Sequence, residues 1–171
     1  AVAVPLDEPS SRAAARLGRA GEPVGVELSD FGLAWMRGEA PADDEARPFT
    51  VLVERLISEG LAPDNGWTLS VSSKVPIGCG LGSGASVAAA AFRAVCGLFG
   101  TARSDRELSD DVFEIEKIHH GTPSGVDNTV VAHSRPVLFR KGGVPSFLSG
   151  PGGTFFLAVA DTGIRHKTAE V

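Results

Sequence analysis

The chain has 171 residues, 43% of them hydrophobic and 22% charged, which is the composition of one globular domain and excludes a disordered or fibrous protein. Its formal net charge of −5 argues against a surface for nucleic acid or for an anionic membrane, because both need clustered Lys and Arg. Any anionic partner is therefore expected to be a small molecule.

Cysteine content and the length of the apolar runs indicate the cellular compartment that is expected for the protein. Cys79 and Cys96 have no CxxC spacing, so the sequence indicates neither a disulfide scaffold nor a zinc site, and both are expected to be packing residues in a cytoplasmic protein. The longest apolar run, residues 87–92, is far shorter than the roughly 20 residues of a membrane span. The first residues lack an initiator Met and the zones of a signal peptide, so a truncated start is expected.

The first predicted strands are residues 24–28 and 31–37, two short runs on either side of the polar pair Ser29-Asp30. Because such a pair favours a turn, we expect these runs to form a hairpin. The acidic segment that follows, residues 38–47, is expected to be a surface loop.

An amphipathic helix is predicted next, from the helical spacing of Phe49, Leu52, Val53, Leu56 and Ile57. The sequence Pro-Asp-Asn-Gly at residues 63–66 predicts a turn after it. Residues 67–75 then alternate apolar and polar side chains, which predicts a half-buried strand.

A glycine-rich loop, residues 76–85, precedes an Ala-rich and nearly all-apolar stretch, residues 86–99, that predicts a buried helix. This order suits phosphate binding, because loop N–H groups and the start of the following helix both attract an anion. The loop matches neither GxxxxGK(S/T) nor GxGxxG, since no Lys follows its glycines and Ser83 stands three residues after Gly80. Taken alone, it is also compatible with a tight turn that serves packing.

A third helix is predicted from the capping-box pair Ser104 and Glu107 and the apolar spacing after it, with its end at Gly121. Beyond it, residues 137–139 and 155–160 are expected to be strands, with a Gly/Pro-rich loop between them.

A compact polar segment, residues 116–128, includes the end of this helix. Its glycines and proline impose a non-helical path, so Ser124 and Asp127 would be presented from a shaped loop. Phosphoryl transfer needs a metal near the phosphates and a group that orients or deprotonates the attacking hydroxyl, and Glu116 and Asp127 can divide these roles. The alternative is a surface carboxylate at Glu116 and a turn or N-cap residue at Asp127.

The histidines do not predict a metal site. His119 and His120 are adjacent, so they point apart on a helix and lack the i, i+4 spacing of a zinc pair. We expect a structural or loop-bonding role for this pair and assign no function to His133 or His166.

Both motifs resemble the GHMP kinases, the family of galactokinase, homoserine kinase, mevalonate kinase and phosphomevalonate kinase. The glycine loop is similar to their Pro-x-x-x-Gly-Leu-Gly-Ser-Ser-Ala signature, and residues 116–128 are similar to the Glu-x-x-x-His-Gly-x-Pro-Ser-Gly-x-Asp-Asn stretch of the mevalonate kinase branch. Residues 160–168 also resemble that branch, so the resemblance extends from about Trp67 onward. It implies an α+β domain of the ribosomal protein S5 domain 2-like type, a mixed sheet with helices packed on one face.

The resemblance also implies chemistry: phosphorylation of the 5-hydroxyl of mevalonate in isoprenoid synthesis, with ATP and Mg²⁺ as cofactors. It implies that Asp127 is the catalytic base or orienting carboxylate and that Glu116 ligates the metal. The residues expected to bind substrate or shape its loop are His120, Gly121, Ser124 and Gly125. Those expected around the ATP phosphates are Pro76, Gly78, Gly80, Leu81, Gly82, Ser83, Gly84, Ala85 and Ser86.

Three departures from the family pattern qualify this expectation. The second serine of the family's loop, a metal ligand in many members, is Gly84 here, so Ser83, Ser86 or water would have to replace it. The family's N-terminal strand with its Lys, and its C-terminal Gly-Ala-Gly-Gly-Gly motif, have no counterpart in the sequence. Residues 1–171 are thus expected to form the N-terminal, ATP-binding domain, incomplete at its start and without the C-terminal domain.

Alternatives remain open at the level of function. Another GHMP kinase with a phosphomevalonate or sugar substrate would fit the glycine loop equally well. A non-catalytic ATP-binding module and a purely structural domain are the other two classes, and a homodimer is compatible with each.

Overall fold

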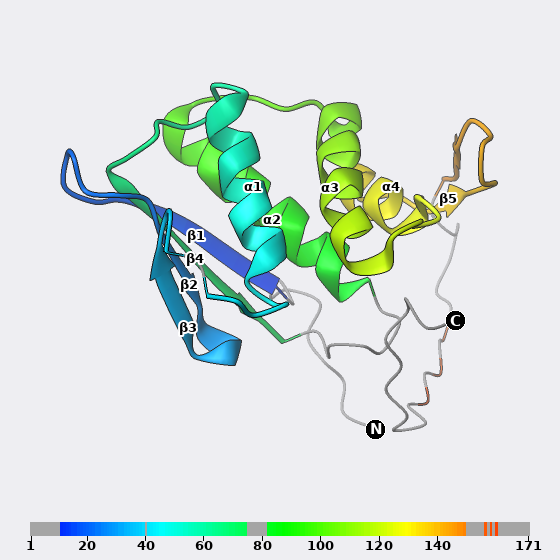
Figure 1. Cartoon of the computed structure of the whole chain (residues 1–171). Coiled ribbons are helices and arrows are strands. Elements are labelled where there is room, and N and C mark those ends of the chain that lie inside the picture. The colour runs from blue at the N-terminus through cyan, green and yellow to red at the C-terminus, as the bar shows by residue number, and fades with distance from the viewer. Residues whose placement is uncertain are drawn as a thin grey trace.

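The structure is a computed structural model that describes residues 11–39, 41–74 and 82–149, together with 156, 158 and 160. Its centre is a four-stranded mixed sheet with the strand order β1-β4-β2-β3. The strands are β1 (Ser11–Leu17), β2 (Gly25–Leu28), β3 (Leu33–Met36) and β4 (Trp67–Ser73). The helices gather on one side of this sheet (Figure 1), which confirms the expected α+β layout.

The sheet contains two antiparallel strand pairs and one parallel pair. Strands β2 and β3 pair antiparallel across the short 3-10 turn η1 (Ser29–Phe31), so the predicted hairpin is confirmed. Strand β4 returns beside β2 in parallel, after the helix that joins β3 to β4. Strand β1 pairs antiparallel with the full length of β4 and was not predicted, because its Ala and Arg residues have weak strand propensity.

The helices are α1 (Arg47–Ser58), α2 (Ser83–Phe99), α3 (Asp105–His120) and α4 (Val126–His133). The first three confirm the predicted helices, although α2 begins three residues earlier than expected. The capping box of α3 is present, with the Ser104 hydroxyl accepting from the Glu107 N–H and the Glu107 carboxylate accepting from the Ser104 N–H. Gly121 ends α3 as predicted. Helix α4 was not predicted.

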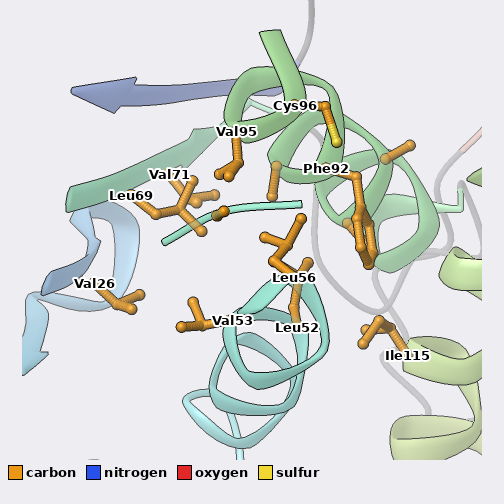
Figure 2. Packing of buried hydrophobic residues seen from close by; sticks show 14 of the residues in the cluster. Val26, Leu52, Val53, Leu56, Leu69, Val71, Phe92, Val95, Cys96 and Ile115 are labelled. Carbon is orange, nitrogen blue, oxygen red and sulfur yellow. The ribbon is translucent and has the colours of Figure 1, made fainter. Parts of the chain in front are cut away.

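One apolar core lies between the sheet and the helices. The alternation predicted for β4 buries Trp67, Leu69 and Val71, while Ser70 and Ser72 remain partly exposed. Figure 2 shows side chains of β2 and β4 meeting those of α1 and α2, with Ile115 of α3 at one side. Cys96 is a buried free thiol in this core, as expected for a packing residue, and burial raises its pKa.

A buried charge cluster joins α1 to α3. Asp111 of α3 is 2% exposed, and its carboxylate accepts a 2.9 Å hydrogen bond from Nε of Arg55 on α1. Nε of Arg103 lies 3.1 Å from its other oxygen, and both arginines also pair with Glu59. A buried carboxylate needs such partners, so this cluster fixes α3 against α1.

A small hairpin of β5 (Val137–Leu138) and β6 (Ser146–Phe147) extends from the end of α4 (Figure 1). It confirms the strand predicted at residues 137–139, whereas β6 falls inside the predicted Gly/Pro-rich loop. The strand predicted at residues 155–160 lies largely outside the described residues. Within the described part of the chain, no helix is long and apolar enough to cross a membrane.

Candidate active site

The first turn of helix α2 is the meeting point of the candidate site residues. Gly82 directly precedes α2 in the left-handed conformation, with φ 65° and ψ 31°. Residues 83–85, expected as loop, are instead helical, and the Ser86 N–H donates to the Gly82 carbonyl at 3.0 Å. Ala85 is buried in the core. The earlier part of the expected phosphate loop, Pro76, Gly78, Gly80 and Leu81 included, lies outside the described residues.

Glu116, in the last turns of α3, faces this helix start. It is only 3% exposed, so the interpretation of Glu116 as a surface carboxylate is wrong. A Cβ added to Gly84 would lie 2.7 Å from Glu116 Oε1. The carboxylate therefore occupies space beside the first turn of α2 that is open only because residue 84 has no side chain.

Asp127 lies near the same helix start. Gly125, with φ 91°, precedes α4, and Asp127 lies exposed in the first turn of this helix rather than in a loop as predicted. Asp127 is helical because the non-helical path imposed by Gly121, Pro123 and Gly125 ends at Gly125, one residue before α4 begins. A Cβ on Gly82 would lie 3.7 Å from the Asp127 carboxyl carbon, so both carboxylates border the α2 start.

Two hydrogen-bonded contacts hold α4, and with it Asp127, in position. Nδ2 of the buried Asn128 donates to the Ser109 carbonyl at 3.1 Å and to the Ser109 hydroxyl at 2.9 Å, which ties α4 to α3. Nη2 of Arg93 on α2 donates to the Ala132 carbonyl at 2.8 Å. Sequence reasoning did not assign these roles, because each contact joins two different helices and depends on how they pack.

The segment between α3 and α4 is a short, ordered connection. Nε2 of His120 lies 3.5 Å from Glu116 Oε2, and the Thr122 N–H donates to the His120 carbonyl at 2.6 Å. The Ser124 hydroxyl accepts from the Val126 N–H at 3.3 Å, which supports the turn into α4. His120 and Ser124 therefore have visible contacts within this connection, and their predicted contact with substrate stays a prediction.

Electrostatics distinguish Glu116 from an ordinary carboxylate. Burial raises the pKa of Glu116 to about 7, and the negative charge of Asp127 adds to this effect. Two carboxylates near one helix start repel each other and would repel a phosphate. A positive charge between them would relieve both effects.

The donor set fits a hard divalent cation. Glu116 Oε1 is buried and has no hydrogen-bond partner, and oxygen donors of this kind are the ligands that Mg²⁺ prefers. Ser83 is the first residue of α2, immediately before Gly84. Among the described side chains, no group of three His, Cys, Asp or Glu is preassembled for a metal.

Comparison with known families places the site helices within one recognised domain. Residues 49–135, about half of the chain, match the family described as the GHMP kinases N terminal domain. This range extends from α1 to just beyond α4, so it includes Glu116, Asp127 and the start of α2.

Curated relatives share sequence with this region. The mevalonate kinase of Thermococcus sibiricus is 35% identical over 116 residues, which cover 68% of this chain and 34% of the relative. The mevalonate kinase of Aeropyrum pernix is 37% identical over 105 residues, which cover 61% of this chain and 32% of the relative. The chain thus spans about a third of the length of these curated relatives.

Solved structures share the fold. The mevalonate kinase of Methanococcus jannaschii has a TM-score of 0.65 at 21% identity, with coverage of 82% of this chain and 46% of that one. A D-glycero-D-manno-heptose 1-phosphate kinase from Bacteriodes thetaiotaomicron also has a TM-score of 0.65, at 15% identity, with coverage of 80% and 46%. The expected fold is therefore confirmed.

Proposed function

The chain belongs to the GHMP kinase family, and on this basis we propose that it forms the ATP-binding part of a mevalonate kinase. The proposed reaction transfers the γ-phosphoryl group of ATP to the 5-hydroxyl of mevalonate, a step of isoprenoid synthesis. The relatives at 35% and 37% identity carry the mevalonate kinase name, which favours this substrate among those of the family.

The observation that carries the proposal is the convergence of Glu116 and Asp127 on the first turn of α2. A helix start offers unpaired N–H groups and the positive end of a dipole, both of which suit phosphate oxygens. Two carboxylates at the same place suit a cation that accompanies the phosphates. Each of these features alone is common, whereas their combination favours a metal–nucleotide site.

Glu116 is the residue proposed to hold Mg²⁺, which when bound would neutralise charge on the ATP phosphates. Its buried, unpartnered Oε1 is available for this role without loss of another contact. The residues from Gly82 to Ser86 are proposed to receive phosphate oxygens with their N–H groups. Ser83 remains a candidate for an additional hydroxyl ligand.

Asp127 is proposed to orient the acceptor hydroxyl and to take its proton. Its side chain is exposed in the first turn of α4, so an incoming hydroxyl has access to it, and it borders Gly82 at the proposed phosphate site. A general base must lie within hydrogen-bond reach of the proton that it removes, and this placement suits that need. The carboxylate does not have to leave a buried position to act.

The test is a coupled assay of ADP release by this chain, within the longest open reading frame that encodes it. Mevalonate, phosphomevalonate, homoserine and galactose are offered separately as acceptors. Release that depends on mevalonate is the expected result. Release with a different acceptor alone would replace the proposed substrate, and nucleotide binding without any release would identify a non-catalytic module.

A further inference from the structure

Gly84 occupies a position that is unfavourable for glycine on local grounds, inside the first turn of α2. Glycine weakens a helix relative to alanine, because its backbone loses more freedom on folding. The left-handed conformation that favours glycine is found at the neighbouring Gly82, not at Gly84. Backbone conformation therefore does not explain the glycine at residue 84.

The contact of Gly84 with Glu116 does explain it. Any side chain at residue 84 would begin 2.7 Å from Glu116 Oε1, a separation closer than van der Waals contact. Gly97 in the same helix is the matched contrast, since a Cβ there would meet no atom within 4 Å. The close approach is thus specific to the helix start where the carboxylate points.

The carboxylate of Glu116 points at this helix start, and no hydrogen bond to Oε1 holds it there. Its side chain is 4% exposed, and Oε1 has no hydrogen-bond partner. Helix α2 has no acidic residue of its own in its first turn. The two carboxylates that border this helix start, Glu116 and Asp127, therefore both come from other helices.

We propose that Gly84 is a specificity-determining position, which admits the Glu116 carboxylate to the first turn of α2 so that Glu116, not a residue-84 hydroxyl, is the direct cation ligand there. The identity of the cation as Mg²⁺ rests on the proposed function. The steric coupling between residues 84 and 116 does not.

The atom that a new Cβ would meet is the far end of a flexible side chain, so substitution moves the carboxylate and leaves the fold intact. Gly84→Ala and Gly97→Ala are both expected to keep or raise the Tm, because alanine favours a helix. Cation affinity separates the two variants. Gly84→Ala should weaken Mn²⁺ binding by roughly tenfold or more, whereas Gly97→Ala should leave it unchanged.

The experiment measures binding of Mn²⁺ alone by electron paramagnetic resonance, on the full chain and its variants. Glu116→Ala and the double variant Gly84→Ala/Glu116→Ala complete a cycle. Once Glu116 is removed, adding Ala at residue 84 should weaken Mn²⁺ binding no further. Gly84→Ser should bind more weakly than the unchanged chain, because serine carries the same Cβ.

Three results would overturn the proposal: no Mn²⁺ binding by the unchanged chain, equal or tighter binding by Gly84→Ala or Gly84→Ser, or an equal loss for Gly84→Ala with and without Glu116. Failure of the proposed function looks different. In that case the Mn²⁺ cycle gives the expected pattern while mevalonate elicits no ADP release.

Discussion

The two ends of helix α2 meet opposite surroundings. Toward its C-terminal end, Phe92, Val95 and Cys96 pack into the apolar core (Figure 2). At its first turn, Gly82 and Gly84 leave space that two carboxylates border. Large side chains fill the core at the C-terminal end, whereas glycines leave space for the carboxylates at the first turn. Substitutions should therefore reduce stability at the C-terminal end and change ligand binding or catalysis at the first turn.

Asp127→Asn is the substitution expected to separate these two properties most widely. The side chain is exposed, so the Tm should stay within about a degree, while loss of a general base should lower kcat by roughly 10²- to 10⁴-fold. Steady-state kinetics and nucleotide binding measure the change, with ATP affinity expected to be retained. Asp110→Asn, on the exposed side of α3, is the matched control, and turnover by Asp127→Asn equal to that of the control would refute the base assignment.

Phe92→Ala is the converse substitution at the apolar end. Phe92 is 1% exposed, and its truncation should lower the free energy of unfolding by about 3–5 kcal/mol, through lost burial and a cavity. Urea unfolding followed by circular dichroism gives the value. Phe156→Ala, at a phenylalanine that is 96% exposed, should change it little, and similar losses for both would contradict the core described here.

At the first turn of α2, the buried Glu116 carboxylate should make the stability of the protein depend on pH. Because the pKa of Glu116 rises from 4.5 to about 7 on folding, the folded chain retains a proton that the unfolded chain releases in this window. The contribution of Glu116 to stability should therefore fall by roughly 3 kcal/mol as pH rises from about 4.5 to about 7, and stay level above it.

Glu116→Gln should remove this dependence, and the difference between its unfolding curve and that of the unchanged chain isolates the effect. Glu114→Gln, at a partly exposed carboxylate of the same helix, should retain the profile of the unchanged chain. Superimposable profiles for Glu116→Gln and the unchanged chain would show that Glu116 does not hold a proton in this window.

Asn128→Ala tests how far the site depends on the position of α4 relative to α3. It is expected to have the smallest effect of the substitutions considered. Loss of the two hydrogen bonds to Ser109 should lower the free energy of unfolding by roughly 1–3 kcal/mol. Turnover should also fall by more than the loss of folded protein explains, because the position of Asp127 depends on the orientation of α4. Val130→Ala, on the exposed face of α4, is the control for both measurements.

Sequence periodicity was enough to predict most of the core but not all of the site. Strand β4 and helices α1 to α3 carry clear periods of two or 3.6 residues, so their buried faces could be inferred. Helix α4 begins Val-Asp-Asn-Thr-Val-Val, residues with weak helix propensity, and its contacts through Asn128 and Arg93 override that preference.

The chemistry of Glu116 and Asp127 could be proposed from residue type and order, whereas their surroundings could not. The burial of Glu116 and its approach to Gly84 depend on how α3 packs against α2. The local sequence around either residue does not indicate how close Glu116 and Gly84 lie. From the sequence alone, Gly84 indicates only a missing hydroxyl, whereas the structure shows that a side chain there would meet Glu116.

The charge cluster around Asp111 has an evolutionary consequence. Removal of one partner leaves a buried charge without compensation and costs about 3–5 kcal/mol, whereas joint replacement by apolar residues is often close to neutral. Arg55, Glu59, Arg103 and Asp111 are therefore expected to change together among relatives, and single replacements should be rare. Lineages that replaced the whole cluster would show that α3 can be anchored by apolar packing instead.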